Sequence, residues 1–575
     1  MANRAQGVAL AARYLRLTGA PEGTLMRVPP GISPATFATA IGQFEQVVGA
    51  QWVFTKEEDT RLYRDAYSPY LGEPEERWAS AAVAPSTVEE VQEIVRIANR
   101  HHIPLYTIST GRNLGYGGSA PAWSGSVVLD LKRMNRILEV NEENAYALVE
   151  PGVSYFDLYR YIQERKIKLW VDCPDPGWGS LVGNALDRGS GYTLPYLRNH
   201  FDAHCGMEVV LADGELLRTG MGALPNSKTW QQYKTGYGPW IDGLFSQSNV
   251  GVVTKMGFWM MPQPEAYRCG RVLVRRRDDL HELIRLVTLL ENSAITNGCP
   301  DSASPLLGIG SIGAQARFLA VDEPLPAEDP QLAGLRDKAE AGDPSELEAY
   351  GRRNNLAYWT FDLKFYGPAK VVAAQWESSQ EILSAIPGAW FEDQGEYRFP
   401  LAEEPKDHAR YPEFGIPSLN NFSLGARSST NPVPSHGHMW LAPIIPRTAD
   451  SIFEANRVFA EAARQFGIPQ LRFALPAWYW QRSAIFIFGF PVSENPEENR
   501  HHREAFFHLI EVCGQHGWAE YRTGPAFQDA VARQFSFNNH SLMRFHEAVK
   551  DALDPNGILS PGRYGIWPKH LRKPS

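Results

Sequence analysis

The stretch STGRNLGYGG at residues 109–118 carries four glycines and one bulky side chain, Tyr116. Glycines at this density allow another group to approach the backbone closely. Residues 115–120 also match the nucleotide-binding fingerprint of doubly wound folds, but that motif needs a helix after it, and Pro121 and a strand-like segment follow here. The fingerprint therefore fits poorly. Two alternatives are a tight turn between strands and a nest of backbone N–H groups around a pyrophosphate.

Further glycine-rich turns occur in the same half of the chain, at residues 174–180, 183–184, 189–192 and 248–251. A single turn between strands would not require them. Several places where the backbone can be approached closely predict a long, extended dinucleotide, and they favour the nest.

The phrases around these turns are specific when they are taken together: GRNLGYGG, GWGSLVGN, GMEVVLADGELLRTGMGALP, GLFSQSNVGVVTKMG and DPNGILSPGR. They resemble the flavoproteins of the vanillyl-alcohol oxidase and p-cresol methylhydroxylase family, over residues 84–262, 438–443 and 517–568. Within it the chain is most similar to the eugenol and vanillyl-alcohol oxidase branch. The resemblance implies an α+β, two-domain FAD-binding fold with an antiparallel-sheet cap, in which residues 1–268 and 517–575 bind FAD and residues 269–516 form the cap.

The resemblance also implies which residues contact FAD. Those matched to the pyrophosphate are Thr110, Gly111, Arg112, Asn113, Leu114, Gly115, Gly117 and Gly118, and those matched to the flavin and ribose are Glu150, Pro151, Gly152, Gly177, Gly179, Ser180, Asn184 and Val253. Arg563 matches a cation near the flavin N1 and C2 oxygen, where positive charge favours the anionic reduced flavin.

His438, in the segment GHMWLAP, matches the histidine that the family bonds covalently to the flavin methyl carbon. A covalent histidyl link would raise the flavin potential and favour hydride acceptance. Noncovalent binding is the alternative, and His436 is a second candidate for the link.

Tyr116, Tyr521 and Arg522 match residues that hold the phenolic oxygen of a substrate. A phenol of pKa about 10 needs roughly 4 kcal/mol of differential stabilisation to ionise near pH 7. One charge-assisted bond from arginine supplies on the order of 1.5–3 kcal/mol and two tyrosine hydroxyls about 1 kcal/mol each, so this trio is sufficient.

The implied reaction oxidises a para-substituted phenol at its benzylic carbon by hydride transfer to FAD, through a quinone methide. Asp175 matches an acid/base group, although an aspartate before proline is more often a turn residue. We expect the substrate pocket to include Tyr192, Trp440, Trp478 and Gln481. Electrons would pass to molecular oxygen or to a separate acceptor, and family members often form homodimers.

Three stretches depart from the family pattern: residues 194–200, which are longer and more basic, residues 420–435, and Gln481 with Arg482, where relatives carry a histidine pair. We expect all three stretches in or near the cap. Their position favours a substrate with an unusual para side chain, such as a larger lignin-derived phenol. Two rival functions are a same-fold flavoenzyme for a sugar, non-phenolic alcohol or 2-hydroxy acid, and a flavin-binding protein without catalysis. An aliphatic alcohol needs no phenolate clamp, which argues against the first.

The elements that must position these residues follow from the pattern. Residues 87–90 form a capping box before a helix, and residues 104–108, 126–131, 146–151 and 250–256 predict strands. A hairpin is predicted around Ala212-Asp-Gly214. Farther on, we expect strands at 271–275, 439–445 and 483–490, helices at 278–291 and 451–466, and a polar, poorly periodic stretch at 327–353.

The composition is that of an ordinary globular enzyme. A chain of 575 residues requires more than one core. A net charge of −9 without a long basic run argues against nucleic acid or anionic membrane as a partner. The five cysteines form no C-x-x-C pattern, so neither a disulfide framework nor a metal site is expected. With no recognisable secretory signal or membrane span, we expect a cytoplasmic protein.

Overall fold

The computed structural model describes residues 27–113, 115–174, 176–309, 330–403, 405, 408–419, 437–468, 471–472 and 474–572. The first sheet has the order β1-β2-β4-β3, with bounds Val53–Phe54, Ala81–Val83, Val127–Asp130 and Leu105–Ile108. β2 and β3 both run parallel to β4, whereas β1 is antiparallel to β2. The glycine loop leaves the end of β3, so this sheet positions it.

Two helices, α2 (Pro34–Val48) and α4 (Val88–His101), share a hydrophobic core with this sheet. The side chain of Thr87 accepts from the N–H of Glu90 at 3.2 Å, so α4 begins where the sequence predicts. The Glu90 carboxylate accepts from the N–H of Ser86 at 2.6 Å. The reciprocal bond of the capping box is therefore made one residue earlier than usual.

The second sheet is antiparallel, in the order β5-β6-β10-β8-β9. Its strands are β5 (Ile137–Asn141), β6 (Tyr146–Val149), β10 (Val252–Trp259), β8 (His204–Val210) and β9 (Leu216–Arg218). The predicted hairpin is confirmed, because Gly214 takes a left-handed φ of 83° between β8 and β9. Helices α5 (Tyr155–Arg165) and α6 (Leu181–Leu186) pack against this sheet.

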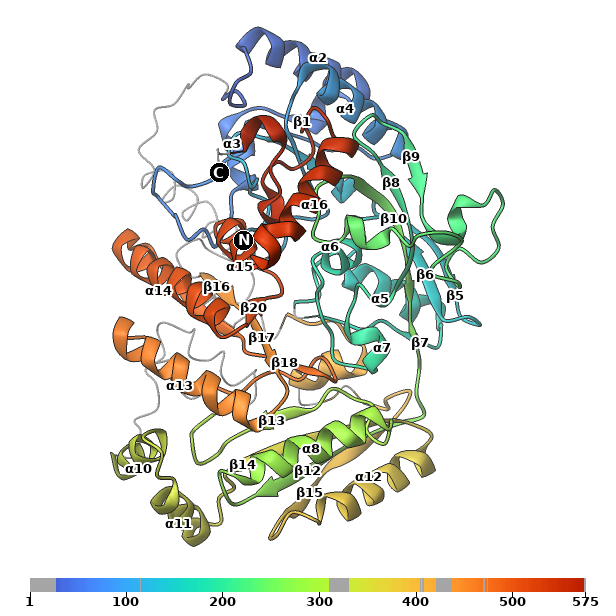
Figure 1. The fold of residues 1–575 in the computed structure, drawn as a ribbon. Coiled ribbons are helices and arrows are strands. Elements are labelled where there is room, and N and C mark those ends of the chain that lie inside the picture. The colour runs from blue at the N-terminus through green and yellow to red at the C-terminus, as the bar shows by residue number, and fades with distance from the viewer. Residues whose placement is uncertain are drawn as a thin grey trace, which may run out of the picture.

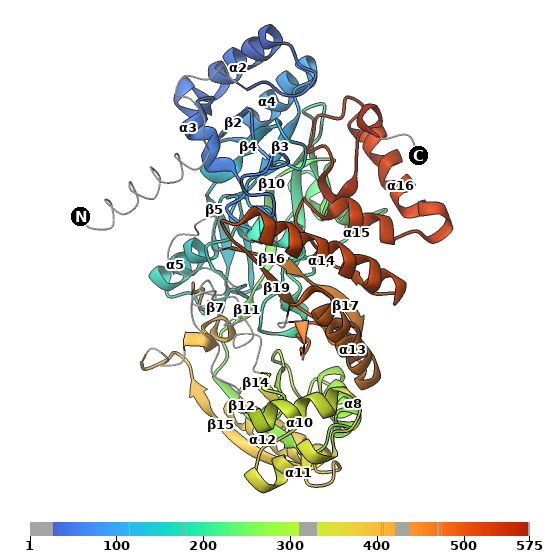
Figure 2. The same ribbon diagram turned by 90° about the vertical axis from the view of Figure 1, so that its left-hand side faces the viewer.

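The end of the chain returns to the first sheet. After α15 (Gln528–Gln534) and α16 (Phe537–Leu553), the N–H of Leu105 in β3 donates to the carbonyl of Ile558, and the N–H of Ser560 donates to that of Leu105, both at 2.7 Å. Figure 2 shows the C-terminal end of the chain, after α16, in the same half of the molecule as α2 and α4 and far from α10–α12. The chain end thus contributes to the same body as β3, while the domain limits at residues 268 and 516 stay a prediction.

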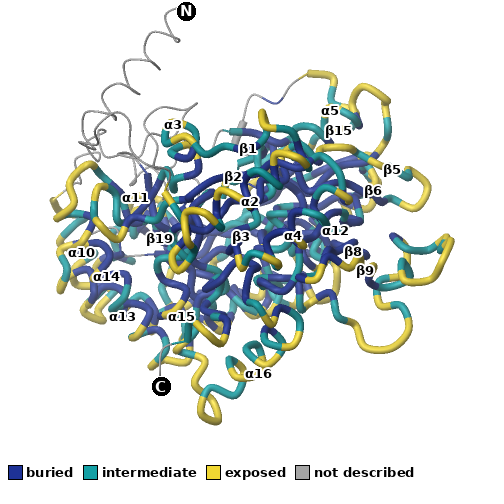
Figure 3. The backbone as a smooth tube through the Cα atoms, turned by 90° about the horizontal axis from the view of Figure 1, so that it is seen from above, coloured by how far each residue is buried: buried dark blue, intermediate teal, exposed yellow. Residues whose placement is uncertain are grey.

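The middle of the chain forms a separate antiparallel sheet, as expected, at the bottom of Figure 1. Its order is β13-β14-β12-β15, with bounds Asp301–Ala303, Trp359–Gly367, Ala266–Val274 and Trp390–Arg398. Helices α8 (Asp279–Asn292) and α12 (Ala369–Leu383) share its core. Buried residues fill the interior of the molecule, whereas exposed ones gather on peripheral loops and on α16 (Figure 3).

Within the described ranges, no helix has both the length and the apolar character needed to cross a bilayer. The polar stretch at 327–353 is more ordered than predicted over its described part, where it forms α10 (Pro330–Glu340) and α11 (Ser345–Asn354). Only Leu335, Ala339, Leu347 and Gly351 are buried in these two helices, too few to produce a clear helical period in the sequence.

Two predicted single strands are each divided in two. Residues 439–445 fall in β16 (Gly437–Leu441) and β17 (Pro443–Pro446), and residues 483–490 fall in β18 (Ser483–Ile485) and β19 (Phe488–Val492). β16 pairs with β19, while β17 pairs with β18 and with β20 (Ala519–Glu520). The chain changes sheets at Ala442, which periodicity alone does not reveal. The division places His438 on β16 and pairs the next strand, β17, with β20, which ends directly before Tyr521.

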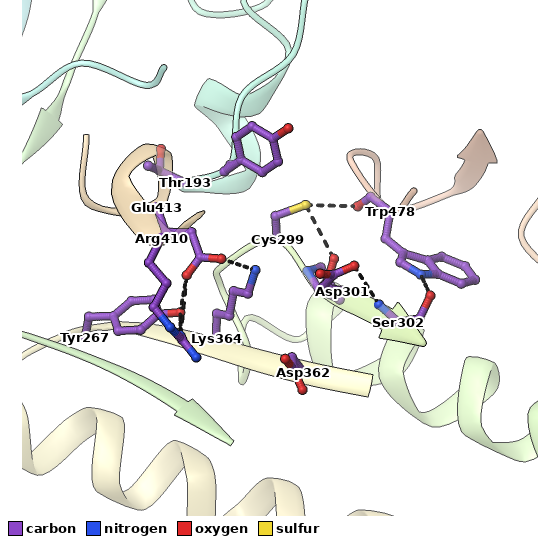
Figure 4. A network of polar contacts seen from close by, with 12 residues as sticks. Thr193, Tyr267, Cys299, Asp301, Ser302, Asp362, Lys364, Arg410, Glu413 and Trp478 are labelled. Atoms are coloured by element: carbon purple, nitrogen blue, oxygen red, sulfur yellow. Dashed lines mark hydrogen bonds and ion pairs between the residues drawn. The ribbon is translucent and has the colours of Figure 1, made fainter. Parts of the chain in front are cut away.

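A buried ionic network joins the cap sheet to the 3₁₀ helix η7 (His408–Phe414), as Figure 4 shows. The ammonium of Lys364 in β14 lies 2.5 Å from Glu413, and the Tyr267 hydroxyl donates to the same carboxylate at 2.5 Å. Asp301, on β13, faces Lys364. Burial raises the pKa of Asp301 to about 6, although Lys364 lowers it. Asp301 is therefore a desolvated carboxylate beside the network, and it accepts a hydrogen bond from the N–H of Ser302 at 2.9 Å.

Asp301→Asn should stabilise the protein at pH 8 by on the order of 2 kcal/mol. The pKa of Asp301 is about 6 in the folded protein, which is higher than in the unfolded chain. The stability that the protonated carboxyl contributes is therefore present at low pH and is lost as the pH rises through 6. Asparagine imitates that protonated form at every pH. The gain in thermal midpoint should be smaller at pH 5 than at pH 8.

Asp343→Asn is the matched control, because this exposed carboxylate has a pKa lowered by its hydrogen bonds from Ser345. It should give no gain at pH 8. A midpoint of Asp301→Asn that equals the wild type at pH 8, or a gain that does not depend on pH, would contradict the assignment.

Candidate active site

A cavity of about 270 Å³ lies at the meeting of the glycine loop, α6, the cap strand β16 and the chain end. Seventeen of the predicted site residues line it: Thr110, Gly111, Arg112, Asn113, Tyr116, Gly118, Pro151, Gly179, Ser180, Asn184, Tyr192, Val253, His438, Trp440, Tyr521, Arg522 and Arg563. The cavity therefore collects residues that are more than 400 positions apart in the chain, such as Thr110 and Arg563.

The glycine loop presents free backbone donors to this cavity. Among the described residues, none accepts a hydrogen bond from the N–H groups of residues 110–113. Gly111 and Gly118 have left-handed φ values of 67° and 53°. Successive N–H groups around left-handed glycines form a concave anion site, and these four fit the pyrophosphate of FAD. The nest interpretation thus accounts for the loop better than a turn between strands does.

Seven predicted residues do not line the cavity: Gly115, Gly117, Glu150, Gly152, Gly177, Trp478 and Gln481. Leu114, Asp175 and His436 lie outside the described residues. Three of the glycines are explained by protein packing. A Cβ on Gly117 would lie 2.2 Å from Pro525, one on Gly152 2.6 Å from the Lys132 carbonyl, and one on Gly177 2.5 Å from Pro417.

Three other predicted residues that do not line the cavity make hydrogen bonds elsewhere in the protein. Glu150 is fully buried and accepts from Arg136 at 2.6 Å. The indole of Trp478 donates to Ser302 at 2.7 Å (Figure 4), and the amide of Gln481 donates to the Glu291 carbonyl at 3.1 Å.

The basic stretch at residues 194–200, which departs from the family pattern, also contacts Glu291, through Arg198. Arg198 is fully buried and lies 3.3 Å from Glu291, which also pairs with Arg447. Arg198 also donates to the carbonyl of Trp478 at 3.3 Å. Arg198 and Gln481 thus contact Glu291 on α8 instead of lining the cavity.

The three residues matched to a phenolic oxygen are close together. The Arg522 guanidinium lies 4.2 Å from the centroid of the Tyr116 ring and 5.1 Å from that of Tyr521. Its Nε is buried and has no hydrogen-bond partner among the residues that the structure describes. Burial opposes the charge of Arg522, but Tyr116 and Tyr521 raise its pKa above the ordinary value. Burial also raises the pKa of Tyr521 well above its ordinary value, so this hydroxyl stays protonated and can donate.

His438 lies on the cavity wall, and its buried Nδ1 has no hydrogen-bond partner within the described ranges. Burial lowers its pKa to about 3, so the imidazole is neutral near pH 7 and keeps a lone pair. The ring is packed between Tyr67 and Trp440, at centroid distances of 5.0 Å and 4.3 Å. A fixed, neutral imidazole is the form that a nucleophilic histidine requires.

Gly115 packs directly behind this histidine, and Gly115→Ala should lower the flavin content of the purified protein several-fold. A Cβ there would lie 2.5 Å from Trp440 Cδ1 and 3.0 Å from His438 Cδ2, on a backbone with φ of 79°. Gly238→Ala is the control, since Gly238 has φ of 89° but nothing within 4 Å of its Cβ. The ratio of flavin to protein absorbance measures the outcome, and equal ratios in both variants would refute the contact.

Sequence reasoning missed several lining residues, among them Tyr106, Asp187, Gln247, Tyr479, Ile487 and Tyr564. Trp478 was predicted to line the cavity, but the next residue, Tyr479, lines it instead. The Tyr479 hydroxyl lies 3.2 Å from the hydroxyl of Tyr192. Alternation along an extended segment could have indicated the exchange. No local sequence pattern indicated that Asp187 lines the cavity, because its hydrogen-bond partners come from distant parts of the chain.

The chain is similar to known flavoproteins in sequence and in fold. A family model described as an FAD binding domain matches residues 79–220. The flavoprotein subunit of 4-cresol dehydrogenase [hydroxylating] from Pseudomonas putida is 33% identical over 94% of this chain and 97% of its own.

Two solved structures are similar over nearly their whole length. The 4-ethylphenol oxidase of Gulosibacter chungangensis has a TM-score of 0.79 and 34% identity, covering 95% of this chain and 100% of its own. p-Cresol methylhydroxylase with substrate bound has a TM-score of 0.79 and 31% identity, covering 94% and 99%. Because identity above 30% extends over almost the full length of both chains, this protein belongs to the vanillyl-alcohol oxidase and p-cresol methylhydroxylase family of FAD-dependent oxidoreductases.

Proposed function

We propose that this enzyme oxidises para-substituted phenols at the benzylic carbon and passes the electrons to molecular oxygen or to a separate acceptor. The observation that carries the proposal is the cluster of Tyr116, Tyr521 and Arg522 on the cavity wall. The relatives support it, because their names give 4-cresol and 4-ethylphenol as substrates. Bound FAD would supply the hydride acceptor.

The three residues would bind the substrate as its phenolate. Arg522 provides the positive charge, and Tyr521 donates a hydrogen bond to the same oxygen because burial keeps its hydroxyl protonated. Tyr116 completes the clamp. A negatively charged oxygen makes the ring electron-rich, so a hydride leaves the para benzylic carbon more easily and a quinone methide remains. Water adds to this intermediate, or an alcohol substrate gives the aldehyde directly.

One part of the cavity wall is aromatic and packs beside Tyr521. Tyr192, Trp440, Tyr479 and Ile487 line the cavity, and the Tyr192 and Tyr479 rings meet edge to face at 5.6 Å. These side chains would enclose the bound substrate and exclude water before hydride transfer. We retain Asp175 as the proposed acid/base group and His438 as the proposed covalent link. A homodimer is proposed from the family alone.

Anaerobic mixing with substrates tests the function directly. The yellow protein should bleach with 4-alkylphenols and 4-hydroxybenzyl alcohols, and should stay oxidised with lactate or glucose. The aliphatic compounds lack an ionisable aryl oxygen for Arg522 and the two tyrosines. Bleaching by lactate would favour the 2-hydroxy acid alternative, and bleaching by none of these compounds would favour a binding protein without catalysis.

A further inference from the structure

Asp187 follows α6 and collects hydrogen bonds from two distant segments. Its carboxylate accepts from the Asn113 amide at 2.6 Å, from Arg563 Nη2 at 3.1 Å and from the Tyr564 hydroxyl. Asn113 belongs to the glycine loop, whereas Arg563 and Tyr564 belong to the chain end. All four residues line the cavity. One carboxylate therefore joins the pyrophosphate loop to the chain end at the cofactor site.

The main cationic partner of this carboxylate is held firmly in place. Arg563 Nη1 donates to the Thr107 carbonyl at 3.2 Å, and the guanidinium lies 5.4 Å from the Tyr106 ring centroid. Burial opposes the charge of Arg563, but Tyr106 and Asp187 raise its pKa above the ordinary value, so it stays charged. The next residue, Tyr564, has an uncommon left-handed φ of 55° for a side chain of its size. Strain of this kind is typical of functional sites.

We propose that Asp187 is a positioning residue that sets the reduction potential of the flavin by fixing Arg563 and offsetting part of its charge. Arg563 lines the cavity, and the family resemblance implies that it lies near the flavin N1 and C2 oxygen, where positive charge would stabilise the anionic reduced form. The carboxylate of Asp187 lowers that field. The hydrogen bonds from Asn113 and Tyr564 in turn spread the negative charge of the carboxylate. The inference needs the FAD site but not the phenol substrate.

Asp187→Asn removes the negative charge with little change in shape. The two-electron potential of the bound FAD should rise by about 30 mV, which corresponds to about tenfold in the ratio of oxidised to reduced flavin. Sulfite, an anion that adds to oxidised flavins, should bind about tenfold more tightly for the same electrostatic reason. Both are measured on the purified yellow protein, by equilibration with a reference dye and by titration of the flavin absorbance.

Asp242→Asn is the matched control, because this buried aspartate pairs with His204 at 3.0 Å and accepts from Thr219 at 2.9 Å, away from the cavity lining. Its potential and sulfite affinity should equal those of the wild type. An unchanged or lower potential in Asp187→Asn would overturn the proposal, and so would an equal rise in the control.

Tyr564→Phe supplies a change of opposite sign. Without the hydroxyl donor the Asp187 carboxylate keeps more of its charge toward Arg563, so the potential should fall and sulfite should bind more weakly. If Asp187→Asn cannot retain FAD, this variant decides: a lower potential supports the proposal, and an unchanged or higher one refutes it. Neither readout involves phenol oxidation, so a failure here is distinguishable from failure of the proposed function.

Discussion

Arg522→Met should lower the rate of flavin reduction by para-alkylphenols about 10–150-fold while FAD stays bound, because the charge-assisted bond that it removes is worth on the order of 1.5–3 kcal/mol. Methionine fills a similar volume in the cavity wall but carries no charge. The hydroxyls of Tyr116 and Tyr521 would then have to hold the phenolate alone. Two neutral hydrogen bonds contribute about 1 kcal/mol each, against roughly 4 kcal/mol needed to ionise a phenol near pH 7. Stopped-flow mixing under anaerobic conditions measures the rate.

The acidity of the substrate provides a sharper test of the charge. In Arg522→Met the rate should rise as the pH approaches about 10, where the free phenol ionises without help. A phenol made more acidic by an electron-withdrawing ortho substituent should lose less of its rate. Wild-type protein should show a flatter response to both changes, because Arg522 already favours the phenolate.

Arg503→Met makes the same exchange at another buried arginine, which lies 2.7 Å from Glu73 and outside the cavity lining. It should reduce with wild-type kinetics. Unchanged kinetics in Arg522→Met would refute the clamp. Loss of FAD from Arg522→Met, but not from Arg503→Met, would show that the residue holds the cofactor instead of the substrate.

Local signals in the sequence predicted much of the fold. Thr87 and Glu90 marked the start of α4, and Gly214 marked the turn between β8 and β9, because capping and left-handed glycine depend on residues a few positions apart. The break at Ala442 could not be predicted in this way. It depends on β17 pairing with β18 and β20, whose residues lie 40 or more positions further on.

The candidate site shows the same limit. Glycines are visible in a sequence, but what approaches them is not: Gly118 borders the cavity, whereas Gly117 accommodates Pro525 and Gly177 accommodates Pro417. Arg563, which the family resemblance assigns to the flavin site, lies on the cavity wall. Asp187, which receives its hydrogen bond, gave no signal, since an aspartate at the end of a helix is usually a solvated turn residue.

Acid precipitation should leave wild-type protein as a yellow pellet, and His438→Ala should release its flavin into the supernatant. The neutral imidazole, whose buried Nδ1 lacks a partner in the described part of the chain, is suited to bonding covalently to the flavin methyl carbon. Alanine cannot form that bond, so only noncovalent contacts would remain, and acid unfolding removes these. The absorbance of pellet and supernatant measures the outcome.

His502→Ala separates this role from a general loss of structure. His502 is also buried, and its Nδ1 lies 2.8 Å from the Pro491 carbonyl, away from the cavity lining. Burial lowers the pKa of His502, as it does that of His438. Both imidazoles are therefore neutral near pH 7, and the two histidines differ in what they face. His502→Ala should keep a yellow pellet. Flavin in the supernatant of the wild type would refute the covalent link, and a yellow pellet in His438→Ala with a colourless one in His436→Ala would move the link to His436.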